Sequence, residues 1–148
     1  MKKPNVRGLK AGSKLAEQAQ QKALMSYVSA RKQLAMLEQQ VQDLERMIGE
    51  YANAAASVGR TTSAAALRGN SSFVKQLSAA ANGIRFKERQ SRELMLRCFR
   101  EWVKSTQRVE ALRATAQRRT DDFDAYQERL DEFVLDEISA ISYERDGR

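Results

Sequence analysis

The sequence predicts an all-α fold, a long antiparallel two-helix coiled-coil hairpin with a rod-like form. The only proline is Pro4, and the 148 residues include only 7 glycines, which disfavours a turn-rich β fold. Apolar residues recur with alternating spacings of three and four in two long stretches. A single turn-rich segment separates these stretches, so we expect one helix in each and a single domain.

The first helix is expected over residues 14–58, and Ser13 is placed to cap it. Its apolar positions form two heptad rows. The first row is Tyr27, Leu34, Val41, Ile48 and Ala55, and the second is Ala16, Ala23, Ala30, Leu37, Leu44, Tyr51 and Val58. Together the rows predict a narrow seam for another helix. Residues 1–13 contain Pro4 and two glycines, and we expect an irregular, basic N-terminus there.

Residues 59–72 are rich in glycine, serine, threonine and asparagine and predict a loop, after which we expect a second helix over 73–140 and a flexible tail over 141–148. The second helix also has two rows. One is Val74, Ala81, Glu88, Met95, Trp102, Val109, Ala116, Phe123 and Leu130; the other is Leu77, Ile84, Ser91, Cys98, Ser105, Leu112, Arg119, Tyr126, Phe133 and Ala140. The pattern leaves open whether Asn82-Gly83 kinks this helix.

The helices differ in length, so the second is expected to extend beyond the first. Folding the chain about residue 66 places residue 14 beside about residue 118, which leaves about 20–25 residues of the second helix unpaired. This overhang carries an apolar stripe made of Phe123, Tyr126, Leu130, Phe133, Val134, Ile138 and Ile141. An unpartnered stripe predicts a binding surface. The alternative is that residues 1–13 fold over it, with their lysines facing the acidic tail.

Charge is strongly polarised along the chain. The net charge is +7 overall, with +7 in residues 85–119 and −7 in residues 120–148. A basic stretch is compatible with a nucleic-acid-binding helical protein, but acidic residues interrupt this one and the tail would repel phosphate. A solvated helical surface explains the pattern more simply. A structural scaffold that dimerises through both seams is the third alternative.

Catalytic chemistry has no support in the sequence. Histidine is absent, and Cys98 is the only cysteine, so neither a disulfide nor a cysteine-rich zinc site can form within the chain. Residues 8–14 resemble a phosphate loop only faintly, because the spacing is one short. The acidic residues near the C-terminus lack the spacing of a calcium loop. We therefore expect no enzyme, cofactor or metal, and, without a signal or membrane span, a cytoplasmic protein.

The order of residues resembles the FliJ family, the small coiled-coil components of the flagellar type III export apparatus, whose form is also similar to the stalk proteins of virulence injectisomes. The resembling segments are Leu37-x6-Leu44-Glu45-Arg46-x2-Gly49-Glu50-Tyr51, Phe73-x3-Leu77-x2-Ala80, Trp102, Arg108-Val109-Glu110-Ala111-Leu112, Glu128-Arg129-Leu130-Asp131 and Leu135-Asp136-Glu137-Ile138. The resemblance covers most of residues 14–140. It implies a non-enzymatic stalk that favours assembly of the export ATPase ring.

The resemblance also implies partners and contact residues. The expected partners are the flagellar export ATPase, the cytoplasmic domain of the export-gate protein FlhA and late-substrate export chaperones, at the cytoplasmic face of the inner membrane. The implied export-gate contact is Gln40, Leu44, Met47, Tyr51, Phe73, Leu77 and Ala80. Met47 and Ile84 depart from the family's polar pattern, whereas the apolar character of the contact is kept. For the ATPase ring we expect Phe123, Tyr126, Leu130 and Phe133.

Overall fold

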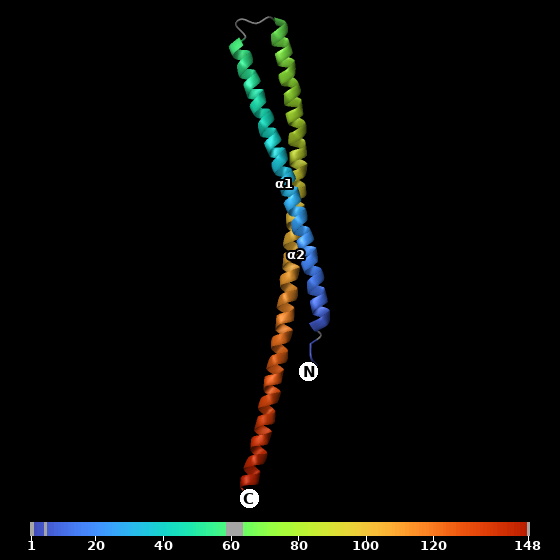
Figure 1. Cartoon of the computed structure of the whole chain (residues 1–148), viewed down its shortest axis with the longest axis vertical. Helices are drawn as coiled ribbons and strands as arrows, with labels where there is room; N and C mark the ends of the chain where they lie inside the picture. The colour runs from blue at the N-terminus through green and yellow to red at the C-terminus, as the bar shows by residue number, and fades with distance from the viewer. Residues whose placement is uncertain (1, 5, 59–63, 148) are drawn as a thin grey trace. The chain divides into compact units, whose positions relative to one another are not determined.

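The protein consists of two long helices that pack against each other as a helical hairpin (Figure 1). The computed structural model describes residues 2–4, 6–58 and 64–147. Helix α1 spans Val6–Val58 and helix α2 spans Ala64–Asp146. The predicted all-α hairpin is therefore confirmed.

Both helices are longer than their sequence patterns predict. Helix α1 begins at Val6 rather than at residue 14, so the segment expected to be irregular is helical through Gly8 and Gly12. A glycine inside a helix costs about 1 kcal/mol relative to alanine. Packing of the N-terminal part of α1 against α2 offsets that cost, because Leu9 and Ser13 are half-buried beside the α2 segment around Ala116.

The expected loop and the expected C-terminal tail were also wrong in part, because α2 is longer than predicted at both ends. It begins at Ala64, so residues 64–72 of the predicted loop are helical, while residues 59–63 lie outside the described residues. The run Ala64-Ala65-Ala66-Leu67 consists of the strongest helix formers and outweighs Gly69. At the other end, residues 141–146 are helical rather than a flexible tail, and α2 runs through Asn82-Gly83 without a break.

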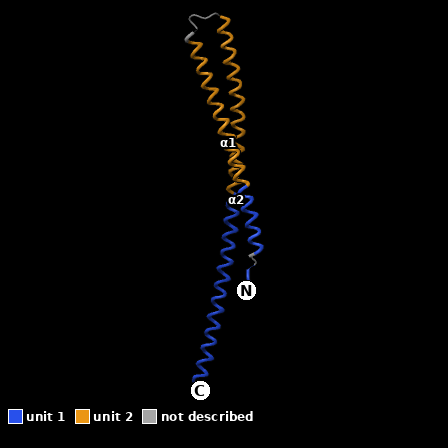
Figure 2. Tube along the Cα trace, viewed as in Figure 1, with its two compact units in different colours: residues 1–21, 104–148 blue, residues 22–103 orange. Residues whose placement is uncertain are grey.

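The chain divides into two compact units (Figure 2). One comprises Lys22–Val103, and the other comprises Met1–Gln21 together with Lys104–Arg148. Each unit contains part of α1 beside part of α2, and we call them the 22–103 unit and the 1–21/104–148 unit.

The buried residues of both units lie in the predicted heptad rows. In the 22–103 unit they are Ala30, Leu34, Leu37, Val41, Ala81 and Ser91, and in the 1–21/104–148 unit they are Ala16, Ser105 and Val109. The seam is therefore confirmed at each of these positions. It is narrow, because a two-helix hairpin can bury only one stripe of each helix.

In the 22–103 unit, one edge of the seam is closed by pairs between the helices. Arg85 pairs with Glu45, and Arg92 Nη2 lies 3.3 Å from Glu38 Oε1. Seven residues further along α2, the ring of Phe99 lies 5.4 Å from that of Tyr27. We call the edge defined by Arg85, Arg92 and Phe99 the paired flank. Residue numbers rise along α2 as they fall along α1, so the helices are antiparallel here.

The 1–21/104–148 unit has the same antiparallel arrangement. Gln20 Nε2 donates a hydrogen bond of 3.1 Å to Thr106 Oγ1, and Arg113 Nη2 lies 2.9 Å from Glu17 Oε1. These partners lie within a few residues of the register predicted by folding the chain about residue 66. Extending that register places the start of α1 level with about residue 124 of α2.

Replacing Gly83 with alanine is expected to stabilise the hairpin by about 0.5–1 kcal/mol. A Cβ at this position would meet no atom within 4 Å, and the residue is exposed within a continuous helix. Thermal unfolding followed by circular dichroism at 222 nm tests this expectation. An unchanged or lower midpoint would mean that α2 is strained at Asn82-Gly83.

Candidate interaction surfaces

The seven residues predicted for the export-gate contact all lie in the 22–103 unit. Leu44 and Leu77 are half-buried in the seam rows and pack the hairpin. Tyr51 and Phe73 are partly exposed and contact each other, with ring centroids 4.9 Å apart and an edge-to-face angle of 69°. The predicted gate residues on α1 and those on α2 are thus linked by one aromatic contact, between Tyr51 and Phe73.

Four of the predicted gate residues, Phe73 among them, lie on the edge of the seam opposite to the paired flank. Each of them directly precedes a residue of the first heptad row, and all are exposed: Gln40, Met47, Phe73 and Ala80. Heptad spacing extends the same edge through Ser26 and Gln33 on α1 and through Lys87 and Leu94 on α2. We call this edge of the 22–103 unit the open flank.

Two hollows lie on the open flank, and they share Gln33 and Leu94. The first, of about 500 Å³, is lined by Gln33, Leu37, Lys87, Gln90, Ser91, Glu93, Leu94 and Arg97. The second, of about 540 Å³, is lined by Met25, Ser26, Ser29, Ala30, Gln33, Leu94 and Cys98. Together they make one groove between α1 and α2, which we call the open-flank groove.

Small side chains in the seam explain the open-flank groove. Ala30, Ser91 and Cys98 occupy positions where a coiled coil usually places large apolar residues, so the helices leave space beside them. The Oγ of Ser91 is buried and has no hydrogen-bond partner among the described residues. These three small residues are the signal by which the sequence could have indicated a groove; the rows alone did not reveal it.

The second surface is the C-terminal part of α2 in the 1–21/104–148 unit. Phe123 and Tyr126 are half-buried, and from Leu130 onward every described residue is exposed. The large apolar side chains among them are Leu130, Phe133, Val134, Leu135, Ile138, Ile141 and Tyr143. The overhang therefore begins nearer to residue 125 than to residue 118, because α1 starts eight residues earlier than the pattern predicts.

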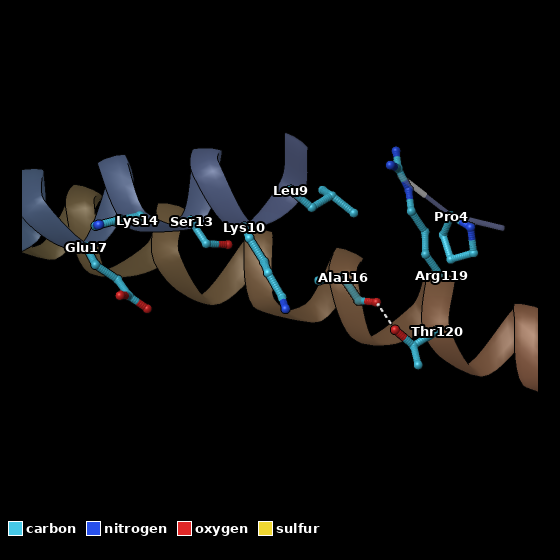
Figure 3. A pocket seen from close by; sticks show the side chains of 9 residues that line it. All are labelled: Pro4, Leu9, Lys10, Ser13, Lys14, Glu17, Ala116, Arg119 and Thr120. Atoms are coloured by element: carbon cyan, nitrogen blue, oxygen red, sulfur yellow. Dashed lines mark hydrogen bonds between the residues drawn. The ribbon is translucent and has the colours of Figure 1, made fainter. Parts of the chain in front are cut away.

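A basic hollow lies where α1 begins, within the same unit (Figure 3). It is lined by Pro4, Leu9, Lys10, Ser13, Lys14, Glu17, Ala116, Arg119 and Thr120. The hydroxyl of Thr120 donates to the Ala116 carbonyl at 3.0 Å, and so is satisfied within its own helix. Glu17 pairs with Arg113. On α2 the hollow is lined by Ala116, Arg119 and Thr120, and it stops short of the apolar stripe, which begins at Phe123.

Several arginines of the basic stretch 85–119 are engaged with carboxylates. Arg85, Arg92 and Arg113 each pair with a glutamate of α1, and Arg92 also lies 2.9 Å from Glu88 Oε1. Paired arginines offer less charge to phosphate, which disfavours the nucleic-acid interpretation. No group of three metal-ligating side chains occurs among the described residues. Nor does any described helix have the length and apolar character needed to cross a bilayer.

A helical hairpin that presents an exposed apolar helix end and an open flank is a helical interaction protein. In a comparison with known protein families, residues 13–148 match the family described as "Flagellar FliJ protein". The match covers most of the chain, and the protein therefore belongs to the FliJ family, a family of non-enzymatic coiled-coil stalk proteins of flagellar type III export. Comparisons with curated proteins and with solved structures returned no match.

Proposed function

We propose that this protein is a stalk of the flagellar export apparatus that promotes assembly of the export ATPase ring and links it to the export gate. Membership of the FliJ family supports the assignment of this protein to the flagellar export apparatus. The exposed apolar stripe on the C-terminal part of α2 is the observation that carries the stalk role. Apolar side chains gathered on one face of a solvent-exposed helix gain free energy when a partner covers them.

The C-terminal part of α2 is the segment that enters the ATPase ring in this proposal. Leu130 and Phe133 are exposed and available for contact, whereas Phe123 and Tyr126 are half-buried and contribute at the edge. The test is to mix the full chain with its cognate export ATPase and to measure hexamer formation and ATP hydrolysis. A stalk increases both. No change in either would refute the role.

The gate contact is proposed on the open flank near the aromatic pair. Phe73 and Met47 present exposed apolar surface there, and the Tyr51 ring orients Phe73. Gln40 and Ala80 lie on the same flank and complete a patch for the cytoplasmic domain of FlhA. Leu44 and Leu77 support this patch from the seam. Late-substrate export chaperones are further proposed partners of the apparatus-bound protein.

Replacing Met47 with glutamate is expected to weaken binding to the FlhA cytoplasmic domain by about tenfold or more. The side chain is 36% exposed and lies off the seam, so a carboxylate there meets water in the free protein but loses it in an apolar contact. Titration calorimetry with the purified FlhA domain measures the loss. The matched control is Met36→Glu, the same change on a more exposed methionine outside the predicted patch. Equal weakening by both variants would contradict the proposed site.

A further inference from the structure

The open-flank groove and the C-terminal part of α2 are complementary surfaces carried by the same chain. The groove has a small, partly apolar floor and lies in a basic region; the C-terminal part of α2 is apolar on one face and strongly acidic. We infer that the open-flank groove binds the acidic C-terminal helix of a second copy of this chain, so that free protein self-associates. This self-association needs neither the ATPase nor the gate, but it uses the same C-terminal helix that is proposed above to enter the ATPase ring, so the two interactions compete.

The groove supplies an apolar floor of adaptable side chains. Met25 and Leu94 line it and are exposed, with 73% of Met25 accessible. Methionine side chains are flexible and polarisable, and exposed methionines are frequent at surfaces that accept a helix. The floor therefore suits an apolar helix face.

The charge of the open-flank groove favours binding of an acidic helix. Lys87 and Arg97 line the groove with a single acidic residue, Glu93. Residues 85–119 carry eleven basic and four acidic side chains, whereas residues 120–148 carry three basic and ten acidic ones. A helix from the second segment is attracted to the first by this difference.

The C-terminal part of α2 also matches the groove in pattern and length. Leu130, Val134, Ile138 and Ile141 lie at spacings of three and four, so they form one apolar stripe. Residues 121–146 extend about 39 Å as a helix, which is longer than the groove segment of about 18 Å along Met25–Leu37. Each copy has one groove and one C-terminal helix, so two copies that exchange these helices satisfy both surfaces in a closed dimer.

Mass measurement tests the self-association directly. Light scattering on the full chain is expected to rise with protein concentration from 16.8 kDa towards twice that value at about 50 mM salt, and to rise less at about 500 mM. Lys87→Glu/Arg97→Glu should weaken the dimer by about tenfold. The matched control, Arg89→Glu/Arg100→Glu, makes the same charge change on exposed residues outside the groove and should weaken it less.

Cross-linking to the native cysteine locates the contact. Cys98 lines the groove and is the only cysteine, so in the Ile138→Cys variant mild oxidation should give a dimer in which Cys98 of one chain is bonded to the introduced cysteine of the other. Peptide mass spectrometry identifies this disulfide. A disulfide between two chains doubles the mass on a non-reducing gel, whereas a bond within one chain does not, so the gel separates the two cases. In the Cys98→Ser background that product should be lost.

Three outcomes would overturn the inference. A chain that remains at 16.8 kDa at every concentration does not self-associate, and the groove then belongs to a different partner. A dimer that both charge variants weaken equally depends on net charge rather than on the groove. A dimer whose only disulfides join the two introduced cysteines to each other pairs its C-terminal helices together. Circular dichroism on each variant verifies that the hairpin is folded.

Discussion

Replacing Phe133 and Ile138 with serine is expected to abolish most of the stimulation of the export ATPase by this protein. The two side chains are 65% and 55% exposed and lie on the unpartnered part of α2. Burying one such side chain in a complex contributes about 1.5–3 kcal/mol, so losing both should raise the concentration needed for half-maximal stimulation at least tenfold. Hydrolysis assays at increasing stalk concentration measure this shift.

The same variant should unfold at nearly the wild-type temperature, because neither side chain packs the hairpin. Tyr143→Ser is the matched control: Tyr143 is the most exposed large apolar residue among those described, and it belongs neither to the four residues assigned to the ring nor to the apolar stripe that includes Ile138. It should leave stimulation within about twofold of wild type. If the double variant stimulates fully, the C-terminal part of α2 is not the segment that contacts the ATPase.

Replacing Val109 with aspartate is expected to disrupt packing in the 1–21/104–148 unit. Val109 is 2% exposed in the seam row. The change removes a buried apolar side chain and places a carboxylate where it is desolvated, at a combined cost of about 3 kcal/mol or more. Such a cost is a large part of the stability of a typical domain, and a narrow seam has few neighbours to absorb it. Thermal unfolding at 222 nm should show a strongly lowered or broadened transition.

The matched control for Val109→Asp is Ala111→Asp, which makes the acidic change two residues later on the exposed face. It should cost less than about 1 kcal/mol, mostly from helix propensity. Equal destabilisation by both variants would contradict the seam and point to a general effect of negative charge on α2.

Much of the fold could be predicted because a coiled-coil seam is local in sequence. Every residue that is buried in the described part of the chain lies in the heptad rows, including Ala81 at 0% exposure and the small Ser91. The antiparallel register followed from one turn-rich segment between two long patterns, and the Glu38–Arg92 pair agrees with it. Helix ends were predicted less well. Val6 and Ala64 lie well outside the rows, since short helical extensions depend on packing and propensity rather than on apolar spacing.

The candidate surfaces, like the fold, were predicted only in part. The residue order indicated the family, and Met47 and Phe73, which lie off the heptad rows, are exposed in the structure. The Tyr51–Phe73 ring contact could not be inferred from spacing, because it joins residues on either side of the turn segment. The open-flank groove was also missed, since its existence depends on small residues of one helix meeting small residues of the other.

The sequence by itself therefore determined which residues face the seam, that the two helices are antiparallel, and that the longer helix carries an apolar stripe beyond the shorter one. Each of these follows from the period of a helix, which a pattern of side chains reveals directly. Only the tertiary structure decided how far α1 covers α2, which flank is closed by pairs such as Arg92–Glu38, and which flank is hollow. Those features depend on side chains from distant parts of the chain, whose sizes and charges act together only once the helices are packed.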